Sequence, residues 1–397
     1  MKLHTTIAAC SLAAFAGLAL GQAKEIRIAH VYDKTGPLEA YAKQTHTGLM
    51  LGFSYATGGR MEVLGRKIVV IEKDSQTKPD VGKAQLAAAY GDDKVDLAIG
   101  PTSSGVALAM LPVAEEAKKI LLVEPAVADQ ITGEAWNRYI FRTGRSSSQD
   151  AIANAVALGK KGTVIATLAQ DYAFGRDGVA AYKAAVEKAG AQVVHEEYAP
   201  ATATDFTAPI QKIIGALKDR PGPKYVFVIW AGKGGPFPQL VDNRLDKYGI
   251  TLTSGSNVLD VLKAMKSLKL EGMVGGAYYY YEIPKNPVND WLVREHTKRF
   301  NEPPDFFTCG GFAAAMAVVA GVQKAGGTDT EKLIAAMEGL EFQTPKGRMV
   351  FRKEDHQALQ AMYAFKMVSK PDVAWLVPTL TRELSLQETA PAITNKR

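Results

Sequence analysis

Short runs of valine, isoleucine and leucine alternate with longer stretches of mixed apolar and polar residues along the first third of the chain. The apolar runs show no strict alternation, which is typical of strands buried on both faces of a parallel sheet. They predict strands at 25–32, 67–73, 95–100 and 120–125. The stretches between them predict helices at 40–57, 79–91 and 104–119. This part of the chain therefore predicts one α/β lobe.

The same order of elements then restarts. Further apolar runs predict strands at 162–170, 191–199, 224–231 and 249–255. Helices are predicted at 175–189, 205–217, 236–248 and 257–267. Two consecutive series of strands and helices imply two α/β lobes rather than one oversized sheet.

The remaining residues, from 270 onward, do not complete a third lobe. They predict a strand at 273–281, helices at 287–300, 308–325 and 330–338, and antiparallel strands within 347–368. We expect these elements to complete the two lobes already begun, so the chain crosses between lobes more than once. The polar tail from about 385 has no periodicity, and we expect it to be frayed.

The first 23 residues have the pattern of a secretory signal. Lys2 precedes the apolar run "TIAACSLAAFAGLAL", and small residues end at Ala23. We expect cleavage after Ala23, with cleavage after Gly21 as the alternative, and a periplasmic location. The apolar run is shorter than the ~20 residues that a membrane-spanning helix needs, and no later segment is predicted to span a membrane.

Composition excludes several classes of protein. The chain has 397 residues, 47 basic and 41 acidic, and its net charge of +6 is spread without blocks. We therefore expect no nucleic-acid partner. Removal of the signal leaves Cys309 as the one cysteine. It predicts a small buried side chain, with no disulfide, no metal site and no cofactor.

The stretch "AIGPTSSGVAL", residues 98–108, follows an apolar strand and raises the question of catalysis. It lacks the lysine of a phosphate-binding P-loop and the G-x-S-x-G spacing of a nucleophile elbow. No base is recognisable, so we expect no enzyme. The loop instead begins a helix, where Ser103 or Ser104 could cap the helix and donate a hydroxyl to a carboxylate. A plain helix cap without a ligand is the alternative.

A second loop, "LLVEPAVADQITG", follows the next strand. Its small residues Ala126 and Ala128 leave the backbone open to close approach. Loops that follow neighbouring parallel strands meet at one edge of a sheet, so we expect the two loops to form one crevice.

Six segments, in this order, carry a family likeness. Together they resemble the periplasmic substrate-binding proteins of branched-chain-amino-acid-type ABC transporters, over about residues 25–370. The segments are "TGPLEAYAKQTHTGLMLGFSYATGG", "KDSQTKPDVGKAQLAAAY", "DLAIGPTSSGVALAMLPVAEEAKKILLVEPAVA", "YIFRTGRSSSQDA", "DYAFGRDG" and "TPKGRMVFRKEDHQA".

The resemblance implies the type I periplasmic binding fold, in which two Rossmann-like lobes with parallel sheets close on a ligand. Three crossovers join the lobes, and we place them near 143–146, 275–280 and 344–347. Lobe 1 then comprises 24–143 and 276–345, lobe 2 comprises 144–275 and 346–384, and 385–397 is a tail.

The resemblance also implies ligand-binding residues. Ser104 would hold a carboxylate, with backbone groups of Thr102, Ala126 and Ala128. Aromatic side chains from both lobes would cover the ligand. They are Tyr41, Tyr172, Phe174, Trp230 and Phe307, with Phe306 as an alternative to Phe307.

This chain departs from amino-acid binders of the family. The loop "SGSNVLD" offers Ser256 and Asn257 but no acid for a ligand ammonium, while Arg145 and Lys233 add positive charge. An unpaired buried charge is costly, so cations without an acid favour a carboxylate ligand that lacks an amine. The aromatic residues favour a planar ligand.

Three functions stay open. The first is a monomeric binding protein that captures a small carboxylate and delivers it to membrane permease subunits. We prefer an aromatic or other amine-free acid to a branched-chain amino acid. The second is a ligand-sensing receptor domain, and the third is a secreted hydrolase.

Overall fold

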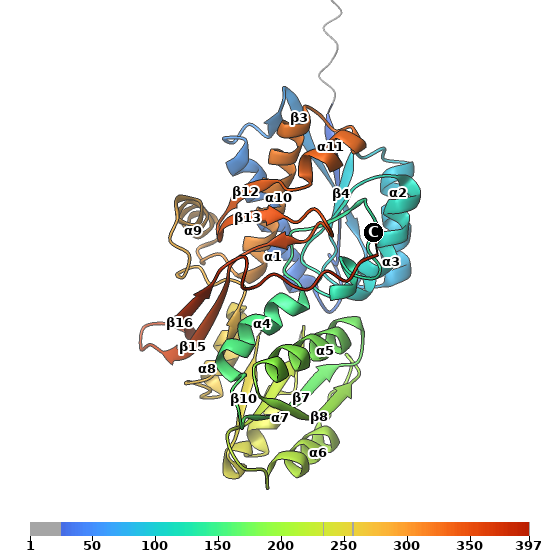
Figure 1. The fold of residues 1–397 in the computed structure, drawn as a ribbon. Coiled ribbons are helices and arrows are strands. Elements are labelled where there is room, and N and C mark those ends of the chain that lie inside the picture. The colour runs from blue at the N-terminus through green and yellow to red at the C-terminus, as the bar shows by residue number, and fades with distance from the viewer. Residues whose placement is uncertain (1–24, 233, 256–257, 397) are drawn as a thin grey trace, which may run out of the picture.

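The computed structural model describes residues 25–232, 234–255 and 258–396. The chain forms two α/β lobes, one above the other in Figure 1, with α4 (Ser147–Leu158) beside the junction between them. Lobe 1 contains the first of the described residues, from 25 onward, and most of the last third of the chain.

Lobe 1 is built on a six-stranded sheet in the order β2-β3-β1-β4-β5-β6. All neighbouring strands are parallel except β2 and β3, which form a hairpin. The strands are β1 (Ile26–Tyr32), β2 (Glu62–Val63), β3 (Arg66–Asp74), β4 (Leu97–Ile99), β5 (Leu121–Val123) and β6 (Ile140–Arg142).

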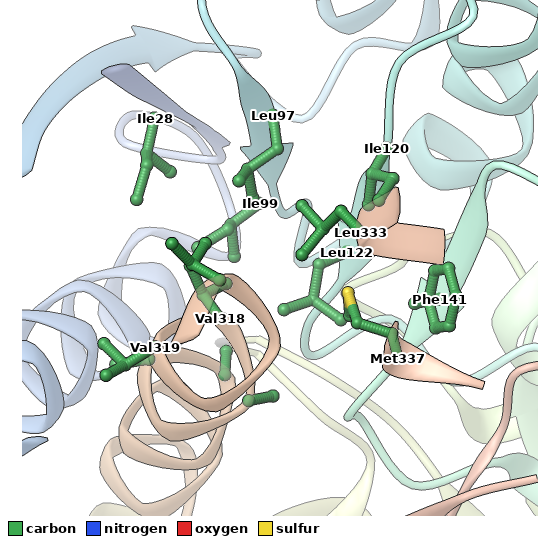
Figure 2. Close-up of a cluster of buried hydrophobic side chains, with 14 of the residues drawn as sticks. Ile28, Leu97, Ile99, Ile120, Leu122, Phe141, Val318, Val319, Leu333 and Met337 are labelled. Atoms are coloured by element: carbon green, nitrogen blue, oxygen red, sulfur yellow. The ribbon is translucent and has the colours of Figure 1, made fainter. Parts of the chain in front are cut away.

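Side chains alternate between the two faces of this sheet, and helices cover both. Ile26 and Ile28 face α1, α10 and α11, and Figure 2 shows part of that cluster. Ala29 and Val31 face α2 and α3. The helices of the lobe are α1 (Glu39–Ala56), α2 (Pro79–Gly91), α3 (Ser104–Ala117), α9 (Pro287–Phe300), α10 (Phe306–Ala325) and α11 (Thr330–Met337).

Lobe 2 repeats the plan on a smaller parallel sheet in the order β10-β9-β7-β8. Helices α4 and α5 pack on one face and α6 on the other. The strands are β7 (Val164–Gln170), β8 (Gln192–Ala199), β9 (Lys224–Ile229) and β10 (Ile250–Ser254). The remaining helices are α5 (Ala173–Lys188), α6 (Thr207–Leu217), α7 (Phe237–Asp242) and α8 (Leu259–Ser267).

Two small antiparallel sheets account for the predicted antiparallel strands. One, in the order β12-β13-β14, packs into the core of lobe 1 through Phe342, Met349 and Phe351. The other, in the order β11-β15-β16, extends lobe 2. Their strands are β11 (Val274–Ala277), β12 (Glu341–Thr344), β13 (Gly347–Phe351), β14 (Ala358–Leu359), β15 (Met362–Ser369) and β16 (Leu376–Leu384).

The three crossovers do not all lie where the sequence placed them. The first is at 143–146, between β6 and α4. The second is at 278–286 rather than 275–280, because β11 pairs with β15 in lobe 2. The third is at 360–361, because 344–347 is the turn of the β12–β13 hairpin inside lobe 1. The predicted lobe boundary at 345/346 is therefore wrong.

A further prediction, about the C-terminal segment, is wrong. The tail is not frayed within 385–396, since Thr389 is fully buried and donates a hydrogen bond to the carbonyl of Gln360 at 2.7 Å. Among the described helices, α10 is long and apolar enough to cross a bilayer, although the sequence analysis named no such segment. Most of α10 is buried inside lobe 1.

Candidate functional site

A cavity of about 110 Å³ lies between the lobes, where loops after the parallel strands of both sheets meet. Lobe 1 contributes the start of α3 and the loop after β5, while lobe 2 contributes α4, α5 and the end of β9. Predicted ligand-binding residues that line it are Tyr41, Thr102, Ser104, Arg145, Tyr172, Phe174, Trp230 and Phe307. The alternative Phe306 lines it as well.

Other predicted residues do not line this cavity. Ser103, Ala126 and Ala128 are buried behind its surface. The backbone N–H of Ala126 donates to the carbonyl of Pro101, and that of Ala128 to Ser104 Oγ. Both N–H groups therefore form hydrogen bonds between the two loops. Asn257, together with Ser256 and Lys233, lies outside the described residues.

The loop before α3 is fixed by a buried carboxylate, Asp33. The backbone N–H groups of Thr102 and Ser103 both donate to Asp33 Oδ2 at 2.9 Å. Backbone groups of Thr102 were expected to hold the ligand, and in this structure its N–H is already bonded to Asp33. Gly100 begins the loop with φ of 124°, and a Cβ there would come within 1.9 Å of the Val31 carbonyl oxygen. Only glycine fits that position.

Hydroxyl groups remain for a ligand at this end of the cavity. Ser104 Oγ accepts from the N–H groups of Val127 and Ala128 at 3.3 and 3.2 Å, which leaves its own hydrogen to donate. Thr102 Oγ1 is buried and has no hydrogen-bond partner in the described part of the chain. A buried hydroxyl without a partner is costly, so a ligand oxygen would relieve that cost.

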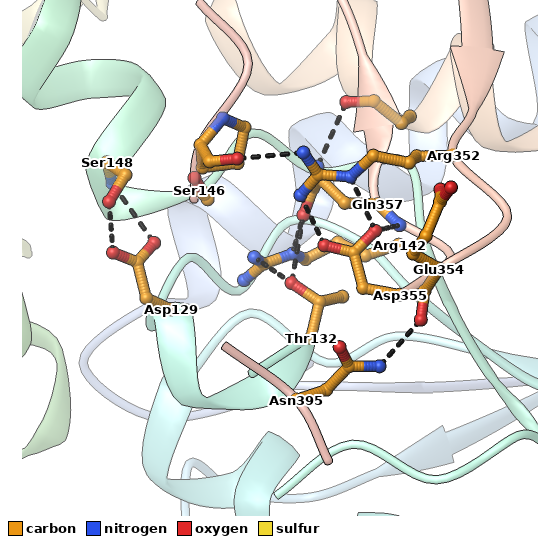
Figure 3. A network of polar contacts seen from close by, with 12 residues as sticks. Asp129, Thr132, Arg142, Ser146, Ser148, Arg352, Glu354, Asp355, Gln357 and Asn395 are labelled. Atoms are coloured by element: carbon orange, nitrogen blue, oxygen red, sulfur yellow. Dashed lines mark hydrogen bonds and ion pairs between the residues drawn. The ribbon is translucent and has the colours of Figure 1, made fainter. Parts of the chain in front are cut away.

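The second loop is held from behind by Arg142, which is fully buried. Its guanidinium donates to the Ala128 carbonyl and to Thr132 Oγ1, each at 2.6 Å, and also to Gln357 (Figure 3). Burial lowers the pKa of Arg142 to about 10. Sequence analysis missed this residue, which positions the loop without lining the cavity.

Arg145 and Asp150 form an ion pair in the wall of the cavity. Arg145 Nε lies 3.1 and 3.2 Å from the two carboxylate oxygens of Asp150. The guanidinium lies over the ring of Phe306, 4.7 Å from its centroid. Burial raises the pKa of Asp150, and the charge of Arg145 opposes that rise.

The prediction of a site with cations and no acid is therefore wrong. Asp150 lies on α4, a helix that the sequence analysis did not predict, and α4 also brings Ser147, Ala151 and Asn154 to the cavity. A signal was present. Ser146 and Gln149 form a capping box in the structure, and serine followed three residues later by glutamine marks a helix start.

Aromatic rings form much of the wall. Tyr41 and Phe307 of lobe 1 are in contact, with ring centroids 4.7 Å apart. Tyr172 and Phe174 lie at the start of α5 with centroids 5.8 Å apart, and Trp230 follows β9. Tyr182 and Phe227, which the sequence analysis did not single out, also line the cavity and stack on each other at 3.7 Å.

Hydrogen bonds also join the two lobes to each other. The N–H of Gly232 in lobe 2 donates to the Tyr41 hydroxyl at 3.1 Å, and the N–H of Asp129 in lobe 1 donates to Asp177 Oδ2 at 2.9 Å. Asp129 also accepts from Ser148 on α4 (Figure 3). Burial and the negative charge of Asp129 raise the pKa of Asp177 to about 6. The lobes are thus in contact with each other at more than one point.

Comparison with known proteins identifies the family. Residues 25–372 match the sequence profile described as periplasmic binding protein. The chain belongs to the periplasmic binding protein family. This confirms the resemblance noted from the six segments and the type I fold that it implied.

Several relatives refine the assignment. A solved "ABC-type branched-chain amino acid transporter" protein from Rhodopseudomonas palustris is 66% identical, with a TM-score of 0.83 over 94% of this chain and 100% of that one. A solute-binding protein from the BisB5 strain, solved with 3,4-dihydroxybenzoic acid, is 28% identical, with a TM-score of 0.80 over 91% and 98%. The leucine-, isoleucine-, valine-, threonine- and alanine-binding protein of Pseudomonas aeruginosa is 25% identical over 88% and 91%.

These likenesses establish the general role of this periplasmic binding protein. It is the substrate-binding protein of an ABC importer, a class that transports solutes, takes a small-molecule ligand and works with membrane permease subunits. Proteins of this class are periplasmic. Relatives include both amino-acid and aromatic-acid binders, so the family alone does not assign the ligand.

Proposed function

We propose that this protein captures a small aromatic or other amine-free carboxylate between its lobes and delivers it to a permease. The observation that carries the proposal is the composition of the cavity. Aromatic rings from both lobes surround it, and hydroxyls and a guanidinium lie on its wall. We further propose that residues 1–23, which lie outside the described part, are an export signal.

The aromatic walls favour a flat, apolar ligand body. Offset or edge-on ring contacts add about 0.5–1.5 kcal/mol each beyond the burial of apolar area. The cavity of about 110 Å³ is comparable in scale to the roughly 150 Å³ apolar cavity that holds one benzene ring. One substituted ring therefore suits this space better than a long or bulky ligand.

Polar groups in the wall favour a carboxylate on that ring. Ser104 and Thr102 provide hydroxyl donors, and Arg145 bonds to Asp150 through Nε alone. A guanidinium has two further NH₂ groups, which suit the two oxygens of a carboxylate. The relative solved with 3,4-dihydroxybenzoic acid supports this ligand class.

The cavity offers little to a ligand ammonium. Asp150 is the one carboxylate in the lining that the structure describes, and its oxygens already accept from Arg145. Bringing an ammonium to Asp150 would place it beside the positive charge of Arg145. We therefore favour a ligand without an amine.

A branched-chain amino acid is the second candidate, and Asp150 is the observation that favours it. An ionised carboxylate has about four acceptor sites, so Asp150 could accept from a ligand ammonium as well as from Arg145. The Pseudomonas aeruginosa relative, named for five amino acids, adds support.

A thermal-shift screen of matched acids tests the proposal. Benzoate and 4-hydroxybenzoate represent the favoured class, phenylalanine adds an amine to an aromatic acid, and leucine represents the second candidate. A ligand that binds the folded state raises the melting temperature by mass action. We expect the benzoates to stabilise the protein most. Stabilisation by leucine or phenylalanine alone would overturn the proposed ligand class.

A further inference from the structure

The C-terminal tail makes an additional connection between the lobes. Strand β16 belongs to lobe 2, where it pairs with β15 along its whole length. After Leu384 the chain leaves that sheet and runs across lobe 1, ending near α3 (Figure 1). A tight turn starts this path, in which Glu388 accepts from the N–H and hydroxyl of Ser385.

Residues 389–395 are bound to lobe 1 at several points. Arg352 donates to the carbonyl of Pro391 at 2.8 Å, and Asn395 donates to the carbonyl of Glu354 at 2.6 Å (Figure 3). Thr394 lies so close to Gly133 that a Cβ on this glycine would come within 2.5 Å of Thr394 Oγ1. The tail is therefore seated along lobe 1 rather than loosely attached.

The tail meets the crossovers at Gln360. This residue lies on the third crossover and is fully buried. Its carbonyl accepts from Thr389 Oγ1 at 2.7 Å, and its side-chain Nε2 donates to the carbonyl of Thr143, on the first crossover, at 3.1 Å. Buried polar groups that are fully bonded in this way fix one arrangement of the chain.

The second crossover joins the same network through Lys346. The Lys346 ammonium donates to Gln360 Oε1 at 2.9 Å and lies 3.8 Å from the ring centroid of Tyr278, where the second crossover begins. Lys346 is only 5% exposed. The Tyr278 ring also contacts Phe306 and lies beneath Arg145, both of which line the ligand cavity. The network therefore reaches the proposed site.

We propose that residues 385–396 form a fourth connection between the lobes, and that Gln360 joins it to the three crossovers so that the tail limits how far the cleft opens. The tail originates in lobe 2 and is seated on lobe 1, so the lobes cannot rotate apart without moving Leu384 relative to Thr389. The inference shares one assumption with the proposed function, namely that the two lobes move relative to each other. Gln360 and Thr389 are positioning residues in it.

Spin labels on the two lobes test this without any ligand. Lys83→Cys on α2 and Lys188→Cys on α5 are exposed attachment sites, whereas Cys309 is buried and does not compete for label. The distance between the two spin labels is measured by pulsed electron paramagnetic resonance in the otherwise wild-type protein. They are repeated with Thr389→Val, with Thr389→Ser, and with residues 386–397 deleted.

We expect Thr389→Val and the deletion to shift the ligand-free distances to longer values, and Thr389→Ser, which keeps the hydroxyl, to restore the wild-type distribution. Thr381→Val, an exposed threonine of β16, is the matched control and should change nothing. A wild-type distance distribution in Thr389→Val would overturn the inference. If the deletion variant does not fold, the result for Thr389→Val is sufficient by itself. Because no ligand is used, failure of the proposed ligand class would leave this result intact.

Discussion

The hydroxyl of Tyr41 in lobe 1 accepts a hydrogen bond from the backbone N–H of Gly232 in lobe 2, at a distance of 3.1 Å. The Tyr41 ring thus lines the cavity, while its hydroxyl oxygen makes a contact between the lobes. Removing the oxygen alone, in Tyr41→Phe, should weaken ligand binding about fivefold, since one net hydrogen bond contributes about 1 kcal/mol. Calorimetric titration with benzoate measures this.

Tyr55→Phe is the matched control for Tyr41→Phe. Tyr55 lies on the same helix, but it packs against Trp291 and Phe312 on the outer side of lobe 1. The affinity of the Tyr55→Phe variant for benzoate should equal that of the wild-type protein. Equal loss in both variants would show that Tyr41 acts through stability rather than through closure.

Ser104→Ala should weaken any carboxylate ligand by about tenfold, because it removes a hydroxyl donor that faces the cavity. Ser103→Ala makes the same change one residue earlier, at a side chain that is buried behind the cavity surface. We expect Ser103→Ala to keep the wild-type dissociation constant for benzoate. Loss of affinity in Ser103→Ala but not in Ser104→Ala would reverse the assignment of the carboxylate position.

Phe174→Leu tests the aromatic wall. It keeps an apolar side chain at the start of α5 but removes a ring that lines the cavity. Binding of benzoate should fall more than binding of cyclohexanecarboxylate, since only the former loses a ring–ring contact of about 1 kcal/mol. Phe300→Leu, an exposed phenylalanine of lobe 1, serves as the control. An equal fall for both acids would mean that Phe174 contributes apolar area alone.

Asp150→Asn separates the two candidate ligand classes. Asparagine keeps the shape of the side chain but removes the negative charge beside Arg145. Affinity for benzoate should be kept or should rise several-fold, because Arg145 then has no competing carboxylate. Affinity for leucine, if leucine binds, should be lost. A loss of benzoate binding would contradict the role given to Arg145.

Asp177 should make ligand affinity depend on pH. Burial and the charge of Asp129, across the contact between the lobes, raise its pKa to about 6, above the ordinary 3.8, so that this contact favours the protonated form. This contribution to affinity is fully present below pH 3.8 and is lost as the pH rises through 6. Benzoate should therefore bind more weakly at pH 7.5 than at pH 5.

Asp177→Asn should remove that difference between pH 5 and pH 7.5. Asp372→Asn, at an exposed position of lobe 2, should retain it. Titrations of the three proteins at both pH values provide the comparison. A pH dependence that persists in Asp177→Asn belongs to another group and would refute the assignment.

Much of the architecture was readable from hydrophobic pattern alone. Runs such as 25–32 and 224–231 are buried on both sides, so they carry a strong signal of a parallel sheet. The third crossover was misplaced because the hairpin that contains Lys346 pairs locally. The proline and glycine of "TPKG" at 344–347 suit a hairpin turn as well as a crossover between lobes, so the sequence alone did not distinguish the two.

The site was less readable, because its geometry depends on contacts that are distant in sequence. The aromatic residues and Ser104 could be named from the family likeness, and they line the cavity. Asp33 could not be foreseen as the partner of the N–H groups at 102 and 103, which lie far from it along the chain. Asp150 was missed because no helix was predicted over 147–158, the segment that carries it.

Calorimetric titration of the wild-type protein with benzoate and with leucine, under the same conditions, tests the proposed ligand class most directly. We expect saturable one-to-one binding of benzoate, with leucine weaker by at least about tenfold, which corresponds to about 1.4 kcal/mol. Tight binding of leucine with no heat from benzoate would contradict this expectation, and would make this protein an amino-acid binder that uses Asp150 for the ligand ammonium.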